Sequence, residues 1–152
     1  MLINNAGTKG GERQALDDLD LAAWHEAFDV NTIGPLLIAR AFKPHLLAAG
    51  DARLMTVSSQ LGASTWPLGG SYVYATSKAA VNKTMQALAI DWRDAPIIVA
   101  MIHPGWVRTD MGGDQAPLSP EESAAGIARL VEDLEMAQSG RFWNWDGSER
   151  AW

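Results

Sequence analysis

Short and almost uninterrupted apolar runs recur along this chain, and they constrain its fold more than any other feature. Four of them have the length of strands, at residues 2–4, 53–58, 97–102 and 141–145. Strands that are apolar on both faces are typical of a parallel sheet covered on both sides. Segments with helical periodicity separate them, which indicates right-handed crossovers. The sequence therefore predicts an α/β fold in which a doubly wound parallel sheet carries helices on both faces.

Capping signals outline the helices between these strands. We expect helices at residues 20–28, 31–49 and 71–93, and a fourth that begins after Ser119. Asp20 and Ser71 are suited to cap the first and third helices, because their side-chain oxygens can accept from free backbone N–H groups. Ser119 is followed by Pro-Glu-Glu, which is a capping box with proline at the first helical position.

The helix over residues 31–49 contains Pro44 and is followed by Gly50. Proline lacks a backbone N–H, so Pro44 should kink or restart the helix, and Gly50 should stop it. Apolar stripes at helical spacing predict the buried faces of the last two helices. The stripes are Val81, Met85, Leu88 and Trp92, and then Ile127, Leu130, Val131 and Leu134.

Composition narrows the class of protein. The 152 residues are 47% hydrophobic and 20% charged, which is typical of one globular domain. A net charge of −6 argues against nucleic acid and anionic membranes as partners. There is no cysteine, no apolar run long enough to span a membrane and no signal-peptide pattern, so we expect a cytoplasmic location. The three histidines lack the spacing of metal ligands, so we expect no metal site.

Tyr74 and Lys78 form a YxxxK pair in the segment YATSK. Residues four apart lie on the same face of a helix, so the two side chains can interact. A free tyrosine has a pKa near ~10 and is a weak acid–base catalyst at neutral pH. A nearby ammonium favours the phenolate, so we expect Lys78 to lower the pKa of Tyr74. Tyr72 lacks such a partner, because the residue four positions later is Thr76.

Five short motifs occur around this pair in a fixed order: NNAG at residues 4–7, NTIGP at 31–35, SSQLG at 58–62, YATSK at 74–78 and PGWVRT at 104–109. In this order they resemble the short-chain dehydrogenase/reductase family, over essentially the whole chain. The tryptophan-rich tail at residues 140–152 is similar to the C-factor-like and sniffer-like carbonyl reductase branch. The resemblance implies a Rossmann-type fold and hydride transfer between NAD or NADP and a small carbonyl or alcohol substrate.

The resemblance also implies four catalytic residues. Tyr74 would be the general acid or base, and Lys78 would assist it and bind the nicotinamide ribose. Ser59 would hold the substrate carbonyl, with Ser58 as the second choice because strand side chains alternate. Asn31 would hold a proton-relaying water, although asparagine is also suited to cap a helix. Ser59 and Tyr74 are about two residues further apart than is commonest in the family, and we expect the extra loop, residues 63–70, to line the substrate pocket.

The resemblance further implies a set of cofactor-binding residues. The small residues after the first strand would line the adenosine side, because they let a ligand approach the backbone. The residues after the third strand would surround the nicotinamide end. With the catalytic pair, the set is Asn5, Ala6, Gly7, Tyr74, Lys78, Pro104, Gly105, Val107 and Thr109. Trp66 and Trp106 could border the substrate pocket or pack in the core, and we expect His103 to be structural.

No strand followed by GxxxGxG and a helix occurs in this sequence. In the family that turn cradles the pyrophosphate. We therefore expect residues 1–152 to form a single partial Rossmann domain, from the family's fourth strand onward. Strand 2–4 would then lie at an exposed edge, which invites pairing with another chain and predicts marginal stability.

Two functions stay open at this point. One is an NAD(P)-dependent oxidoreductase of the short-chain type. The other is a truncated, non-catalytic remnant that acts only as an interaction or dimerisation module. In the family, the two long helices, here 31–49 and 71–93, commonly build the subunit interface, so a homo-oligomer is expected in either case. A serine hydrolase is disfavoured, because the chain has no GxSxG elbow.

Overall fold

The computed structural model describes residues 1–152 and contains a four-stranded parallel sheet. Its strands are ordered β1-β4-β5-β6. Their bounds are β1 Leu2–Asn4, β4 Ala52–Val57, β5 Ile97–His103 and β6 Phe142–Asn144. All seven residues of β5 are buried, as expected for the centre of a covered sheet. The predicted parallel α/β sheet is therefore confirmed.

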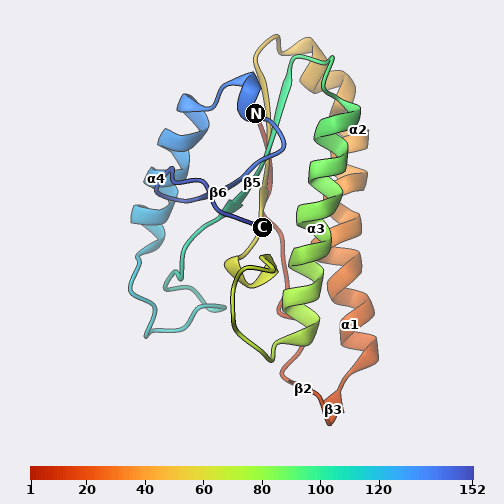
Figure 1. The fold of residues 1–152 in the computed structure, drawn as a ribbon, viewed down its shortest axis with the longest axis vertical. Coiled ribbons are helices and arrows are strands. Elements are labelled where there is room, and N and C mark those ends of the chain that lie inside the picture. The colour runs from red at the N-terminus through yellow and green to blue at the C-terminus, as the bar shows by residue number, and fades with distance from the viewer.

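Helices cover both faces of this sheet (Figure 1). On one face lie α1 (Leu21–Phe28), α2 (Gly34–Ala48) and α3 (Tyr72–Asp91), and on the other lies α4 (Pro120–Asp133). Two separate apolar clusters correspond to the two faces. The larger has 14 buried residues, among them Met85 of α3 and Val99 of β5, and the smaller has 8, among them Leu130 of α4 and Ile102 of β5. The doubly wound arrangement is thus confirmed.

Short elements complete the chain. A hairpin of β2 (Gln14–Ala15) and β3 (Asp18–Leu19) precedes α1, and the single turns η2 (Gln60–Gly62) and η3 (Met136–Gln138) follow β4 and α4. None of the helices is both long and apolar enough to cross a membrane.

The first two predicted helices are continuous. A π-helical turn, η1 (Asp29–Ile33), joins α1 to α2 without a break, so the helix cap that Asn31 could have provided does not occur. Pro44 lies inside α2 and does not restart it. Gly50 has a φ of +74°, and α2 ends at Ala48, just before it. The predicted stop is therefore confirmed. Of the two effects expected of Pro44, a kink or a restart, the restart does not occur.

The caps of the other helices differ in outcome. Asp20 and Ser119 cap α1 and α4 as predicted, and Ser119 and Glu122 form the full capping box. Ser71 does not cap α3, because its backbone is left-handed with a φ of 50° and its hydroxyl makes no capping hydrogen bond. A capping side chain normally requires an extended backbone. The predicted stripes are buried in both helices, except that Ile127 is half-buried.

Strand β1 forms one edge of the sheet, because only β4 pairs with it. The side chain of Ile3 in this strand is 44% exposed, although Asn4 is buried. Asn4 Nδ2 donates to Thr56 Oγ1 of β4 and to the Pro35 carbonyl of α2, both at 3.3 Å. The predicted exposed edge is confirmed, and Asn4 ties this edge strand to its neighbours.

Candidate active site

The candidate site lies at the carboxyl ends of β1 and β4, where the N-terminal half of α3 meets the π-helical turn η1. Ligands bind at the carboxyl ends of strands in open parallel sheets. Three of the four predicted catalytic residues, Asn31, Ser59 and Lys78, are buried, and Tyr74 is half-buried. Their contacts, given below, link them through backbone and side-chain hydrogen bonds.

Lys78 is the one lysine, arginine, aspartate or glutamate that is buried. Its side chain is 3% exposed, and its Nζ donates to the Val57 carbonyl at the end of β4 over 2.9 Å. The same Nζ lies 5.8 Å from the centroid of the Tyr74 ring. Burial disfavours the charged ammonium and lowers the pKa of Lys78 from 10.5 to about 8.

The pKa of Tyr74 shifts in the opposite direction from the expected one. Burial raises it, because the phenolate loses contact with water, and the neighbouring Ser59 hydroxyl lowers it by a smaller amount. Lys78 does not lower it, since its Nζ faces the Val57 carbonyl and its own charge is destabilised by burial. The phenol of Tyr74 is therefore held in its protonated form.

Ser59 and Ser58 are directed differently, as strand alternation predicts. Ser59 caps η2 by accepting from the Leu61 N–H at 3.2 Å, and its hydroxyl is close enough to Tyr74 to affect its pKa. Ser58 instead donates to the Lys78 carbonyl at 3.5 Å. Ser59 is thus the serine that faces the tyrosine.

Gly62 allows η2 to approach α3. A Cβ built on this residue would lie 2.6 Å from the Lys78 carbonyl carbon and 2.8 Å from the Ala79 nitrogen. Such contacts with backbone atoms are not tolerated, so only glycine permits the turn that carries Ser59 to pack on the helix that carries Tyr74. The sequence motif SSQLG included Gly62, but its packing role becomes visible only in three dimensions.

Asn31 is 1% exposed, and both the nitrogen and the oxygen of its side-chain amide make hydrogen bonds. Its Nδ2 donates to the Thr8 carbonyl and to Ser77 Oγ, and its Oδ1 accepts from the Thr8 N–H, each at 2.9 Å. It therefore fastens the loop after β1 to α3. Thr8 and Ser77 were not singled out from the sequence, although each lies within or next to a motif. Single π-turns of this kind are frequent at functional sites.

Gly7, one of the residues predicted to bind a cofactor, lies beside the predicted catalytic residues Asn31 and Lys78. A Cβ at this position would be 3.2 Å from Asn31 Oδ1 and 3.4 Å from Lys78 Nζ. Asn5, Ala6 and Gly7 are exposed at the end of β1. The backbone here is therefore open to a ligand and close to the buried lysine.

The cofactor-binding residues predicted after β5 lie at the same end of the sheet but make no hydrogen bond to the predicted catalytic residues. The Pro104 carbonyl accepts from Ser123 Oγ of α4 at 2.6 Å, and Gly105 has a φ of +87°. Val107 is half-buried, and the exposed Thr109 accepts from the Gly112 N–H at 3.2 Å. This segment is thus held by α4 and by its own turn.

The burial of two tryptophans and one histidine bears on the roles expected of them. Trp66 and Trp106 are 39% and 53% exposed, so core packing is excluded for both. His103 is 7% exposed, and burial lowers its pKa to about 4, which agrees with a structural role. No group of three or more His, Asp or Glu side chains is arranged so that it could hold a metal ion.

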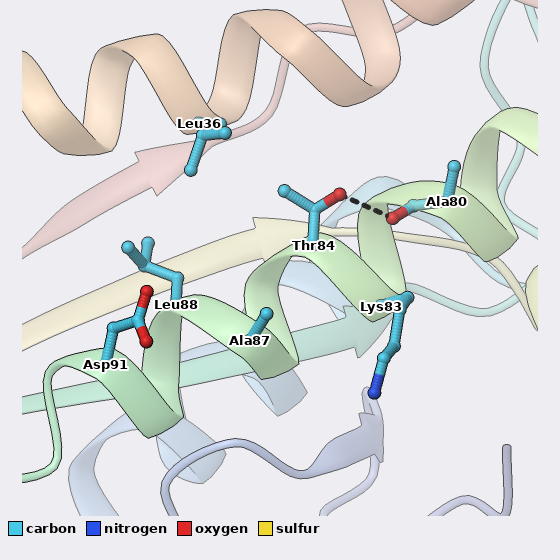
Figure 2. Close-up of a pocket in the computed structure, with 7 residues that line it drawn as sticks. All are labelled: Leu36, Ala80, Lys83, Thr84, Ala87, Leu88 and Asp91. Carbon is cyan, nitrogen blue, oxygen red and sulfur yellow. Dashed lines mark hydrogen bonds between the residues drawn. The ribbon is translucent and has the colours of Figure 1, made fainter.

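A groove of about 520 Å³ lies apart from this site, between α2 and α3. Figure 2 shows Leu36 of α2 across from the α3 residues Ala80, Thr84 and Leu88, with Lys83 and Asp91 at its borders. None of the predicted catalytic residues lines it. The groove is therefore a feature of the helical surface and not of the candidate active site.

Comparisons with known proteins agree with these motifs. Residues 1–118 match the sequence pattern of the short chain dehydrogenase family. The chain is 38% identical to C-signal of Myxococcus xanthus, over all of this chain and 92% of that protein. Its structure is similar to the carbonyl reductase Sniffer of D. melanogaster (34% identity, TM-score 0.93) and to an NADPH-bound carbonyl reductase from chicken fatty liver (33% identity, TM-score 0.89).

The extent of these matches differs. In both structural comparisons 99% of this chain is covered but only 65% of the other chain, so the chain spans about two thirds of the length of those carbonyl reductases. The family pattern nevertheless covers most of the residues, including Asn31, Ser59, Tyr74 and Lys78. The chain therefore belongs to the short chain dehydrogenase family.

Proposed function

We propose that this chain carries the catalytic centre of an NAD(P)-dependent oxidoreductase that interconverts a small carbonyl compound and its alcohol. The observation that supports this proposal best is the meeting of five residues at one end of the sheet. Asn31, Ser59, Tyr74 and Lys78 come from three separate elements, and Gly7 leaves open backbone beside them. Membership of the family supports the same activity.

The proposed roles follow from the contacts. Ser59 donates a hydrogen bond to the substrate carbonyl and stabilises the negative charge that develops on its oxygen. Tyr74 then gives its phenolic proton to that oxygen. The phenol carries its proton at neutral pH, as the acid in carbonyl reduction must, although burial raises its pKa and so makes it a weaker acid than a free tyrosine. A bound nicotinamide would supply the hydride.

Lys78 and Asn31 support the proton transfer in this proposal. With a pKa of about 8, Lys78 can give up and regain a proton near neutral pH more readily than an ordinary lysine. Asn31 holds the loop that contains Gly7 against α3 through its three hydrogen bonds. In this proposal Lys78 therefore exchanges the proton, and Asn31 keeps the loop beside it in place.

The residues present fit the nicotinamide half of an NAD or NADP molecule. Lys78 is the residue expected to bind the nicotinamide ribose, and Gly105, expected at the nicotinamide end, has a backbone that favours glycine. Gly7, expected on the adenosine side, leaves space beside Lys78 Nζ that a Cβ would fill. The chicken fatty liver relative binds NADPH. The residues that we propose to contact the cofactor are Asn5, Ala6, Gly7, Tyr74, Lys78, Pro104, Gly105, Val107 and Thr109.

A second candidate function is an interaction module. Large apolar side chains are exposed along α2, among them Leu37 (46%) and Phe42 (43%), and the groove of Figure 2 lies beside them. Exposed apolar surface of this kind marks an interface. We propose that α2 and α3 pair with a second copy of the chain, whether or not the chain is catalytic. The cytoplasmic location stays a prediction.

The first experiment titrates the folded 152-residue protein with NADH and NADPH and follows the quenching of its seven tryptophans. Circular dichroism of the same sample reports whether it is folded. Saturable binding, with turnover of carbonyl substrates, supports the oxidoreductase. Folded protein that binds neither nucleotide supports the interaction module instead.

The matched test of the mechanism compares Tyr74→Phe with Tyr72→Phe. Both residues are on α3, but Tyr72 is 37% exposed and is followed four residues later by Thr76 instead of lysine. We expect Tyr74→Phe to lower kcat by at least about a hundredfold while leaving the Kd for NADPH nearly unchanged. Tyr72→Phe should keep wild-type turnover. Equal turnover in the two variants would rule out Tyr74 as the proton donor.

A further inference from the structure

The last residues of the chain form a short tail that is fastened to β6. After β6 the chain turns and runs back beside it, with Glu149 opposite Trp143. The Arg150 N–H donates to the Phe142 carbonyl at 2.8 Å, and Arg150 Nε donates to Asn144 Oδ1 at 2.6 Å. These bonds fix the direction in which the tail leaves the sheet.

Trp152 is half-buried and packs the end of this tail against the core. Its ring centroid lies 5.8 Å from that of Phe142, a fully buried residue of the larger apolar cluster, and Trp152 packs against that cluster. In Figure 1 the C-terminus lies next to η2, at the point where the loop of residues 63–70 begins. The tail therefore connects the sheet to this loop.

Three contacts join the tail to the loop. The Thr65 N–H donates to the Trp152 carbonyl at 3.1 Å, and Thr65 Oγ1 donates to the Ala151 carbonyl at 3.3 Å. The Arg150 guanidinium lies 5.7 Å from the centroid of the Trp66 ring. Residues 64–70 make no other hydrogen bond outside the 63–70 loop. The tail is thus the principal restraint on the loop between its two ends.

Few other contacts restrain the conformation of this loop. A Cβ built on Gly69 or Gly70 would have no neighbouring atom within 4 Å, so no other part of the protein packs there. Gly70 and Ser71 both have positive φ. Glycine-rich backbone has many accessible conformations, so an unrestrained loop of this composition would sample them. The same loop follows η2, which Ser59 caps, and leads to α3, which carries Tyr74 in its first turn.

We propose that the Ala151–Trp152 tail is a positioning element, which holds the loop of residues 63–70 as the substrate-side wall of the Tyr74 site. The tail acts through Thr65 and does not touch the reacting atoms. Its effect on catalysis rests on the proposed oxidoreductase function, whereas its hold on the loop does not. In the proposed reaction it sets how firmly the carbonyl substrate is bound and leaves the proton transfer itself unchanged.

Hydrogen exchange measured by mass spectrometry tests the hold on the loop. In a chain shortened by residues 151–152, we expect the peptide that covers residues 64–70 to exchange about tenfold faster, because both acceptor carbonyls are lost. Peptides from α4 should be unaffected. Trp152→Phe keeps both carbonyls and an aromatic anchor and should retain wild-type exchange. Glu149→Gln removes only the exposed ion pair with Arg141 and is the matched control.

If the shortened chain does not fold, a point substitution still tests whether the tail holds the loop. Thr65→Val alters an exposed residue and removes only the hydrogen bond to the Ala151 carbonyl. We expect its loop peptide to exchange about threefold faster. Unchanged exchange in Thr65→Val and in a folded shortened chain overturns the proposal.

Turnover separates positioning from a general loss of structure. We expect the shortened chain to show a KM for the carbonyl substrate raised about tenfold, with kcat within about twofold of wild type, and Trp152→Phe to restore the KM. An unchanged KM in a chain whose loop exchanges faster overturns the positioning role. Zero turnover by the wild-type chain counts against the oxidoreductase function, and the exchange result still decides whether the tail holds the loop.

Discussion

Replacing the buried lysine should stabilise this protein while it removes the proposed activity. Lys78 is 3% exposed, its Nζ has one hydrogen-bond partner, the Val57 carbonyl, and burial is the only cause of its lowered pKa. Its positive charge is therefore held in the core without a compensating anion. Methionine has a similar length and no charge, so Lys78→Met is the informative perturbation.

The magnitude follows from the pKa. Burial lowers the pKa of Lys78 from 10.5 to about 8, and each pKa unit corresponds to about 1.4 kcal/mol, so the charged form costs the native state about 3 kcal/mol. Methionine removes this cost but leaves the Val57 carbonyl without a donor, which costs about 1 kcal/mol. We therefore expect Lys78→Met to raise the free energy of unfolding by about 2 kcal/mol at pH 7.

The gain should depend on pH with a definite sign. Between pH 8 and 10.5 the native state has lost the Lys78 proton while the unfolded chain still binds it. Stability rises with pH wherever the unfolded state binds more protons, so the wild type gains stability across this window and the variant does not. The advantage of Lys78→Met at pH 7 should therefore vanish, or reverse, near pH 10.

Urea denaturation at pH 7 and pH 10, followed by tryptophan fluorescence, measures both effects. For a domain of this size the midpoint at pH 7 should move up by about 1 M. Lys83→Met is the matched control, because Lys83 is an exposed lysine on the same helix, and its effect should stay within about 0.5 kcal/mol. A lower midpoint for Lys78→Met at pH 7, or a difference that is the same at both pH values, would refute the reasoning.

Three other predictions concern packing, acid stability and assembly. Gly62→Ala should lower stability by about 1–3 kcal/mol, seen as a lower Tm, because its Cβ would overlap the α3 backbone. The pKa of His103 is about 4 in the folded chain and 6.5 when the side chain is free. As the pH drops, the unfolded chain therefore binds this proton first, and the free energy of unfolding should fall by up to about 3 kcal/mol between pH 6.5 and 4. His103→Gln should flatten this part of a pH series of urea midpoints. Leu37→Glu should shift a homo-oligomer to monomer in sedimentation velocity, and an unchanged sedimentation coefficient would remove α2 from the interface.

Much of the candidate site could be predicted from local sequence. Tyr74 and Lys78 share a helix face because four residues make about one turn, and Ser58 and Ser59 face opposite ways because strand side chains alternate. These relations depend only on backbone geometry. What local sequence did not reveal are contacts between distant segments, such as Asn31 with Thr8 and Ser77, which join elements 23 and 46 residues apart.

The direction of the Tyr74 pKa shift shows the same difference between what local sequence predicts and what contacts between distant segments decide. From the sequence, a lysine one turn away predicts a lowered pKa for Tyr74. In the folded chain, burial of both groups dominates, and the Lys78 ammonium donates its hydrogen bond to the Val57 carbonyl. Desolvation depends on everything packed around a side chain, so no pattern of spacing within α3 could have indicated it.

By itself, the sequence determined the α/β class, the order of strands and helices, the capping box at Ser119 and the family, because each depends on periodicity or on short motifs. The tertiary structure alone decided that α1 and α2 are continuous through a π-turn, that Ser71 is left-handed, that Gly62 must be glycine and that Thr65 donates hydrogen bonds to the C-terminal tail. The physical reason is that close approach, burial and strain depend on neighbours far away in the chain.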